Sequence, residues 1–202
     1  MRVLFQGDSV TDASRNREDP MDLGIGYAKM ASEMLRSEYP DTEFEFFNRG
    51  IGGNRSHDLD ARWTEDAIEL DPDVISILIG INDTWHTVNK GMPHEEFETH
   101  YRSILERVKK ETSAKLIMME QFTLPHPNSE QYHPDVDIKI QITRKLAREF
   151  ADVYVPVDGI LAKACVGADM DKLTSDGVHP KEAGHRIIAK AYVEAFKELG
   201  VI

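Results

Sequence analysis

Short apolar runs alternate with segments of helical periodicity along almost the whole chain. The strand-like runs are residues 2–6, 44–48, 74–79, 116–119 and 153–157. The helix-like segments are residues 27–38, 56–70, 95–110, 138–150 and 181–199. Residues 74–79 are nearly all apolar, which is typical of a parallel strand buried on both faces. Because parallel strands are joined by crossover helices, the alternation predicts an α/β fold. We expect a three-layer α/β/α sandwich around a five-stranded, mainly parallel sheet.

The length and charge of the chain narrow the class of protein. A length of 202 residues predicts one domain, residues 1–202. The formal net charge of -12 repels nucleic acid, and no apolar stretch approaches the length that crosses a membrane, so we expect neither as a partner. The sole cysteine, Cys165, cannot form an internal disulfide, and a strand-like run begins almost at once. Both observations favour a cytoplasmic location.

Four polar, glycine-containing loops follow predicted strands or precede the last predicted helix. They read GDSV at residues 7–10, NRGIGGN at 48–54, GIND at 80–83 and DGVHP at 176–180. In an open parallel sheet, ligand sites lie beyond the carboxyl ends of the strands. We therefore expect these loops to converge on one rim of the sheet and to hold the chemistry there.

The residues in these loops are those of serine-based acyl transfer. A serine hydroxyl is a poor nucleophile unless a base takes its proton and an acid orients that base. We expect Ser9 to be the nucleophile, His179 the base, and Asp176 the orienting acid. The oxyanion of a tetrahedral intermediate needs hydrogen-bond donors. The candidates are the backbone N–H groups of Ser9 and Gly53 and the side-chain amide of Asn82.

The four blocks, in this order, resemble those of the SGNH hydrolases, the family of GDSL-like lipases and acylhydrolases. The resemblance spans the chain from the first predicted strand to the last predicted helix. It implies a flavodoxin-like sandwich, catalytic roles for Ser9, Asp176 and His179, and no metal or organic cofactor. Gly53 matches the oxyanion glycine of the family because it directly precedes a polar residue, whereas the neighbouring Gly52 stays an alternative.

Within the family, the blocks at 5–12, 48–55 and 80–85 look most like those of bacterial carbohydrate acetylesterases, including intracellular acetylxylan esterases. The resemblance implies a small-molecule ester substrate with a short acyl group, chiefly acetyl, on a xylo-oligosaccharide or another sugar. Asp8, Trp85 and Trp63 are candidates for substrate contact. The two tryptophans are candidates because an aromatic face can lie against a sugar ring. Relatives of this kind often form homo-oligomers. The long irregular connection at 123–137 is expected to shape the pocket or a subunit contact.

Three other functions stay open on the sequence alone. The same blocks serve acyl-thioesterases and lysophospholipases of the family. A metal-dependent phosphoesterase would need several ligands close together, but the polar residues at 57–60 lie in a helical pattern in which successive side chains point to different faces. A non-catalytic carbohydrate-binding module is the third alternative. Because the chain keeps every member of the triad, we favour an enzyme.

Overall fold

The computed structural model describes residues 1–202, and a sheet of five strands lies at its centre. The strands are β1 (Arg2–Gly7), β2 (Glu45–Asn48), β3 (Val74–Leu78), β4 (Lys115–Met119) and β5 (Val153–Val155). They lie in the order β2-β1-β3-β4-β5, and every neighbouring pair is parallel. The predicted α/β class and five-stranded sheet are confirmed, and the sheet is wholly rather than mainly parallel.

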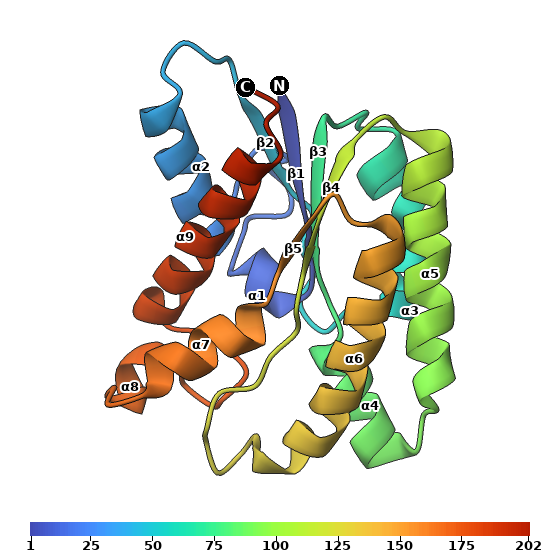
Figure 1. Cartoon of the computed structure of the whole chain (residues 1–202), viewed down its shortest axis with the longest axis vertical. Helices are drawn as coiled ribbons and strands as arrows, with labels where there is room; N and C mark the ends of the chain where they lie inside the picture. Colours follow the sequence, from blue (N-terminus) through green and yellow to red (C-terminus); the bar gives the residue numbers. More distant parts are fainter.

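Helices connect the strands and cover both faces of the sheet (Figure 1). In chain order they are α1 (Ser9–Asp12), α2 (Tyr27–Glu38), α3 (Ser56–Ala61), α4 (Ile81–Lys90), α5 (His94–Glu111), α6 (His133–Phe150), α7 (Val157–Cys165), α8 (Met170–Leu173) and α9 (Glu182–Glu198). A π-helical turn at Thr64–Ile68 and a 3-10 turn at Glu130–Tyr132 add to these. α2 packs with α9 on one face, and α3, α5 and α6 cover the other. This arrangement gives the three layers that the sequence predicts.

Neighbouring residues of β1 face two separate cores. The ring centroid of Phe5 lies 5.9 Å from that of Tyr27 and 4.9 Å from that of Tyr192, in the core beneath α2 and α9. The next residue back, Leu4, belongs to the core on the other face, together with Trp63. Successive side chains of a strand point to opposite faces of the sheet. A strand covered on both faces is therefore buried along its whole length, as β3 is.

The carboxyl ends of the strands lie at one edge of the sheet, at the bottom of Figure 1, and both chain termini lie at the opposite edge. α1 follows β1 after a single residue, and α4 begins soon after the end of β3. Since β1 lies between β2 and β3, the three loops that follow these strands start side by side. The sheet order thus brings three of the four polar loops to one place.

Three segments differ from the sequence prediction. The polar loop predicted at 80–83 is instead the start of α4, which burial of Ile81 and Thr84 holds in place although Asn, Asp and Thr are poor helix formers. The long connection expected at 123–137 is shorter, because α6 begins at His133 with a proline in its first turn. The helix expected at 56–70 ends at Ala61 and continues as the π-helical turn. None of the helices has the length and apolar character that crossing a membrane requires.

Candidate active site

Ser9, His179 and Asp176 form a chain of two hydrogen bonds at the carboxyl edge of the sheet. The hydroxyl of Ser9 lies 3.0 Å from Nε2 of His179, and Nδ1 of that ring lies 2.7 Å from Oδ2 of Asp176. Ser9 begins α1, separated from the end of β1 by one residue, whereas the other two residues come from the loop before α9. A neutral ring that donates from Nδ1 to a carboxylate presents an unprotonated Nε2 to the hydroxyl. In this arrangement an imidazole can take a proton from serine.

The loop that carries Asp176 and His179 is held by its own hydrogen bonds. Oδ1 of Asp176 accepts the N–H groups of Val178 at 2.9 Å and His179 at 2.8 Å. Burial acts to raise the pKa of Asp176, but the backbone N–H and the ring of His179 outweigh it, and the pKa lies below its ordinary value. The carboxylate is therefore ionised at neutral pH and can stabilise an imidazolium beside it.

The connection after β4 supports this loop from outside. The N–H of Leu124 donates to the carbonyl of Gly177 at 2.7 Å, and the hydroxyl of Ser129 donates to the carbonyl of Leu124 at 2.8 Å. Gly177 has a φ of 87°, and a Cβ at that position would overlap the side chain of Ser129. Only glycine combines this backbone conformation with so close an approach. The connection therefore shapes the site by fixing the loop of the histidine.

Asp8 caps α1 instead of facing substrate. Only 2 % of Asp8 is exposed, and its Oδ1 accepts the N–H of Val10 at 3.0 Å. This cap stabilises the turn that makes Ser9 the first helical residue. Burial, reinforced by the nearby charge of Asp83, raises the pKa of Asp8 to about 7 against the opposing hydrogen bond from Val10. The expectation that Asp8 contacts substrate is wrong, because its carboxyl lies in the interior.

Two adjacent glycines after β2 differ in the use of their N–H groups. The N–H of Gly52 donates to Oδ2 of Asp12 at 3.0 Å. The N–H of Gly53 makes no hydrogen bond within the chain, and a Cβ at this position would meet nothing within 4 Å. The loop lies against the serine, since a Cβ on Gly52 would be 3.7 Å from Cβ of Ser9. An oxyanion donor must be both free and approachable, so the structure favours Gly53 over Gly52.

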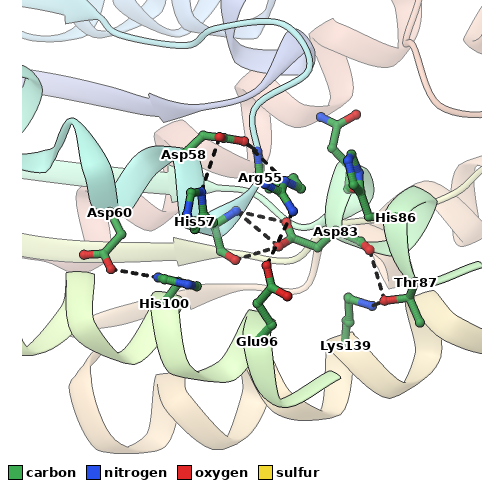
Figure 2. A network of polar contacts seen from close by, with 12 residues as sticks. Arg55, His57, Asp58, Asp60, Asp83, His86, Thr87, Glu96, His100 and Lys139 are labelled. Carbon is green, nitrogen blue, oxygen red and sulfur yellow. Dashed lines mark hydrogen bonds and ion pairs between the residues drawn. The ribbon is translucent and has the colours of Figure 1, made fainter. Parts of the chain in front are cut away.

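Asn82 lies in the first turn of α4, next to the same loop. Its side-chain amide donates one N–H to the carbonyl of Asn54 at 3.0 Å, which fixes the amide and leaves its second N–H available. The next residue, Asp83, accepts the N–H of Ser56 at 3.0 Å and its hydroxyl at 2.6 Å (Figure 2). Two consecutive residues of α4 thus hold the loop that carries Gly53.

A buried group of charges lies behind this contact. Burial raises the pKa of Asp83, although the hydrogen bonds from Ser56 and the charge of Lys139 oppose the rise. The side chain of Lys139 is fully buried, and its Nζ donates to the hydroxyl of Thr87 at 2.9 Å and to Oδ2 of Asp135 at 2.5 Å. Figure 2 shows Lys139 and Thr87 beside Asp83. α4 is therefore anchored at its first turn to the segment after β2 and at Thr87 to α6.

Asp12 is a site residue that the sequence reasoning missed. It is 6 % exposed, and its Oδ2 accepts the N–H of Gly52 and pairs with the guanidinium of Arg17. An acid three residues after a serine is a weak signal by itself. Its partner Gly52 is 40 residues away in the chain, so no local pattern could have indicated the contact.

The two tryptophans lie in different surroundings. Trp63 is fully buried in the core that includes Leu59, so its ring cannot lie against a sugar, and that expectation is wrong. Trp85 on α4 is 41 % exposed, and Nζ of Lys90 lies 5.1 Å from the centroid of its ring. Trp85 does not line the cavity that contains Ser9. Substrate contact by Trp85 stays a prediction.

A cavity of about 660 Å³ opens beside Ser9 and His179. The rest of its wall comes mainly from α1, from the turn after it, and from the start of α9. Its volume lies within the range of small-molecule sites. The arrangement offers an activated hydroxyl, a base with its orienting acid, free hydrogen-bond donors and room for a ligand. These are the parts that acyl transfer requires.

The residues at 57–60 do not form a metal site. Nδ1 of His57 lies 3.5 Å from Oδ1 of Asp58, and Asp60 pairs separately with Nδ1 of His100 at 2.9 Å (Figure 2). No group of three or more His, Cys, Asp or Glu side chains lies close enough together to hold a metal ion. These side chains form ion pairs and hydrogen bonds on the faces of α3 and α5.

Comparison with known proteins extends over nearly the whole chain. A model of the GDSL-like lipase/acylhydrolase family matches residues 5–187. The acetylxylan esterase of Geobacillus stearothermophilus is 31% identical over an aligned length of 209 residues. The alignment covers 98% of this chain and 94% of that protein. A crystal structure of that esterase has a TM-score of 0.86 and covers 100% of this chain and 94% of its own. The crystal structure of a candidate GDSL-like lipase from Parabacteroides merdae is 32% identical and has a TM-score of 0.92. The match covers 98% of this chain and 95% of that one.

The matched region contains all four polar loops and the hydrogen-bonded chain of Ser9, His179 and Asp176. Fold alone does not establish an activity, but here the similarity in sequence and the chemistry of the site agree. The chain belongs to the GDSL-like lipase/acylhydrolase family and is a carboxylic ester hydrolase.

Proposed function

We propose that this chain is a serine esterase that removes acetyl groups from xylo-oligosaccharides or related sugars through an acyl-enzyme on Ser9. The observation that carries the proposal is the pair of hydrogen bonds joining Ser9, His179 and Asp176, next to a loop whose Gly53 has a free N–H. The choice of an acetylated sugar is supported by the 31% identity with an acetylxylan esterase.

In the acylation step, Oγ of Ser9 attacks the carbonyl carbon of the ester while Nε2 of His179 takes the hydroxyl proton. The carbonyl oxygen becomes an oxyanion, which the N–H groups of Ser9 and Gly53 and the amide of Asn82 stabilise. The intermediate then collapses, the ester C–O bond breaks, and His179 gives its proton to the departing alcohol. Asp176 holds the ring and stabilises its positive charge between the two transfers.

In the deacylation step, a water molecule takes the place of the alcohol. His179 removes a proton from the water as its oxygen attacks the acyl carbon, and a second oxyanion forms at the same donors. Collapse of this intermediate breaks the bond to Oγ of Ser9, which recovers the proton from His179. The products are the free enzyme and acetic acid, which releases its proton to water at neutral pH and becomes acetate. In both steps His179 thus takes a proton from the attacking oxygen and gives it to the departing oxygen.

The test is a substrate series measured by mass detection of released acetate. The purified protein is incubated with acetylated xylose and xylobiose, and p-nitrophenyl acetate is compared with p-nitrophenyl octanoate. We expect acetate release from the sugars, faster cleavage of the acetate than of the octanoate, and labelling by a fluorophosphonate that is lost in Ser9→Ala.

Each part of the proposal can fail separately. Retained hydrolysis in Ser9→Ala would exclude the acyl-enzyme at this residue. Faster cleavage of the octanoate would exclude the preference for a short acyl group and would point to a lipolytic esterase of the same family. Cleavage of p-nitrophenyl acetate without release from any acetylated sugar would exclude the sugar substrate alone.

A further inference from the structure

His185 lines the cavity beside Ser9 but belongs neither to the triad nor to the loops of the oxyanion donors. It lies in the first turn of α9 and is 9 % exposed. Its Nδ1 accepts the backbone N–H of Tyr27 at 3.2 Å. Its Nε2 has no hydrogen-bond partner within the chain, and this atom is not fully buried. Nε2 is therefore an accessible atom without an internal hydrogen bond, on a residue that lines the cavity.

The contact with Tyr27 determines which nitrogen of His185 carries the hydrogen. Because Nδ1 accepts a hydrogen bond, a neutral ring must carry its hydrogen on Nε2. Burial, with a smaller contribution from the charge of His179, lowers the pKa of His185 to about 4. The ring is therefore neutral near pH 7 and carries an N–H donor on Nε2, in a residue that shares the cavity wall with Ser9.

The ring of His185 is also held in position. A Cβ on Gly26, the N-cap of α2, would lie only 2.9 Å from Cε1 of His185. The absence of a side chain at Gly26 lets the first turn of α2 pack directly against the ring. A donor that is already held in place loses little conformational freedom on binding, so its hydrogen bond contributes more to affinity.

The cavity lies on the side of the serine where the alcohol leaves. The departing oxygen receives its proton from Nε2 of His179, so it must lie within hydrogen-bond distance of that atom. His179 and the residues that follow it line the cavity, whereas Gly53 and Asn82 do not. The oxyanion therefore points toward Gly53 and Asn82, and the alcohol part of the ester extends into the cavity, toward His185.

The other walls suit an alcohol that has both apolar and hydroxyl-bearing faces. Ile25, which is 70 % exposed, and Met30 supply apolar surface. Ala13 and Ser14 have φ angles of 42° and 62°, a left-handed conformation that residues other than glycine rarely adopt. The N–H of Ile25 donates to the carbonyl of Ala13 at 2.9 Å and holds this turn. Ser14 thereby becomes part of the cavity wall.

We propose that the Nε2–H of His185 recognises a hydroxyl or ring oxygen of the departing alcohol, which makes this cavity a subsite for polyhydroxylated alcohols such as a sugar ring. The inference rests on the ester cleavage at Ser9 proposed above and adds a residue that selects the alcohol. His185 takes no part in breaking the ester bond. Its removal should therefore affect esters of hydroxylated alcohols and spare esters of alcohols without further hydrogen-bonding groups.

Two matched variants separate the donor role of His185 from its contact with Tyr27. In His185→Asn, the amide oxygen takes the place of Nδ1 as acceptor, and the Nε2–H donor is lost. In His185→Gln, the longer amide reaches the position of Nε2 and can donate there. Both variants and the natural chain are assayed on a monoacetylated methyl xyloside, on glycerol monoacetate and on phenyl acetate, whose leaving group has no further hydroxyl.

We expect His185→Asn to lower kcat/KM about 5- to 20-fold on the xyloside and the glycerol ester, mainly through a higher KM. A decrease of this size corresponds to the loss of one hydrogen bond. On phenyl acetate the change should stay within about twofold, since no bond to Nε2 is lost there. His185→Gln should keep most of the activity on all three substrates. An equal loss on all three esters in both variants would mean that His185 is only structural, and no loss on the hydroxylated esters would exclude the subsite.

A direct binding measurement gives a readout apart from turnover. In Ser9→Ala, the imidazole nitrogens of His185 are observed by NMR while methyl xyloside or glycerol is added. We expect the Nε2–H tautomer before addition and a shift of its signal on addition, whereas a ring protonated on Nδ1, or no shift with either alcohol, would overturn the proposal. If only glycerol shifts the signal and only its ester is cleaved, the sugar assignment fails while the subsite stands.

Discussion

Asp83 accepts both the backbone N–H and the hydroxyl of Ser56, at 3.0 Å and 2.6 Å, and so joins the first turn of α4 to the first residue of α3, where the loop after β2 ends. Asn82, one residue before Asp83, holds the carbonyl of Asn54 in the same loop. The donors expected to stabilise the oxyanion come from these two segments, Gly53 from the loop and Asn82 from α4. Their relative position therefore depends on Asp83.

The first prediction concerns this positioning role. Asn82→Ala should lower kcat about 10²- to 10³-fold, the usual effect of removing an oxyanion donor. Asp83→Asn keeps the shape of the side chain, but its single amide oxygen accepts the two hydrogen bonds from Ser56 less well than a carboxylate does. We therefore expect a smaller loss of roughly 10-fold in kcat, with little change in KM. The double variant should lose less than the product of the two effects, because Asp83 acts through Asn82. Multiplicative losses would show that the two residues act independently.

The second prediction concerns the acid of the triad. Asp176→Asn keeps the side-chain oxygen that can accept the N–H groups of Val178 and His179. It removes the charge that stabilises the imidazolium and the acceptor that holds the hydrogen on Nδ1. We expect kcat to fall about 10³- to 10⁴-fold with the melting temperature nearly unchanged, as measured by acetate release and circular dichroism. A loss below tenfold would mean that another group orients His179.

The third prediction links the buried carboxyl of Asp8 to stability. Burial raises its pKa from 3.8 to about 7, so between these pH values the folded protein holds a proton at Asp8 that the unfolded chain has lost. The contribution of Asp8 to the free energy of unfolding is therefore present below about pH 4 and declines as the pH rises through about 7. Over this range the loss amounts to about 4 kcal/mol for a shift of this size.

Asp8→Asn isolates this contribution, because the amide oxygen still accepts the N–H of Val10 and does not titrate. Measured as a difference from the natural chain, the unfolding free energy of the variant should rise steadily between pH 4 and 7. Taking the difference between variant and natural chain cancels the contributions of other titrating groups, which are the same in both. One of these is His185, whose lowered pKa makes the free energy of unfolding rise with pH between about 4 and 6.5, opposite to the effect of Asp8. A difference that does not change with pH would show that the carboxyl of Asp8 is ionised in the folded protein throughout.

The fourth prediction separates the two tryptophans. Trp63 is fully buried in the core of the α3, α5 and α6 face, so Trp63→Ala should lower the free energy of unfolding by about 3–5 kcal/mol. Where the variant is folded, KM for an acetylated sugar should stay within about twofold, because the ring touches no ligand. Denaturant titration and initial rates measure the two effects. A raised KM with unchanged stability would restore Trp63 as a sugar platform.

The order of the elements and the grouping of Ser9, Asp176 and His179 were predictable from the sequence, because both predictions start from local patterns. Apolar runs of strand length alternate with helical periodicity, and this pattern specifies a parallel α/β sandwich. The polar blocks lie where such strands end, and Ser9, Asp176 and His179 are the residue types that acyl transfer needs. Neither inference requires knowledge of a distant contact. α4 was not predictable in this way, because its polar sequence conceals the burial of Ile81.

The tertiary structure decided which polar groups are free and which are already occupied. The distinction between Gly52 and Gly53 depends on Asp12, and the donor of His185 depends on the backbone N–H of Tyr27. These partners are 40 and 158 residues away in sequence. The burial of Asp8 and Trp63 likewise results from packing between distant elements. A residue type shows what chemistry a side chain can perform, but only the folded chain sets its partners, its exposure and its protonation.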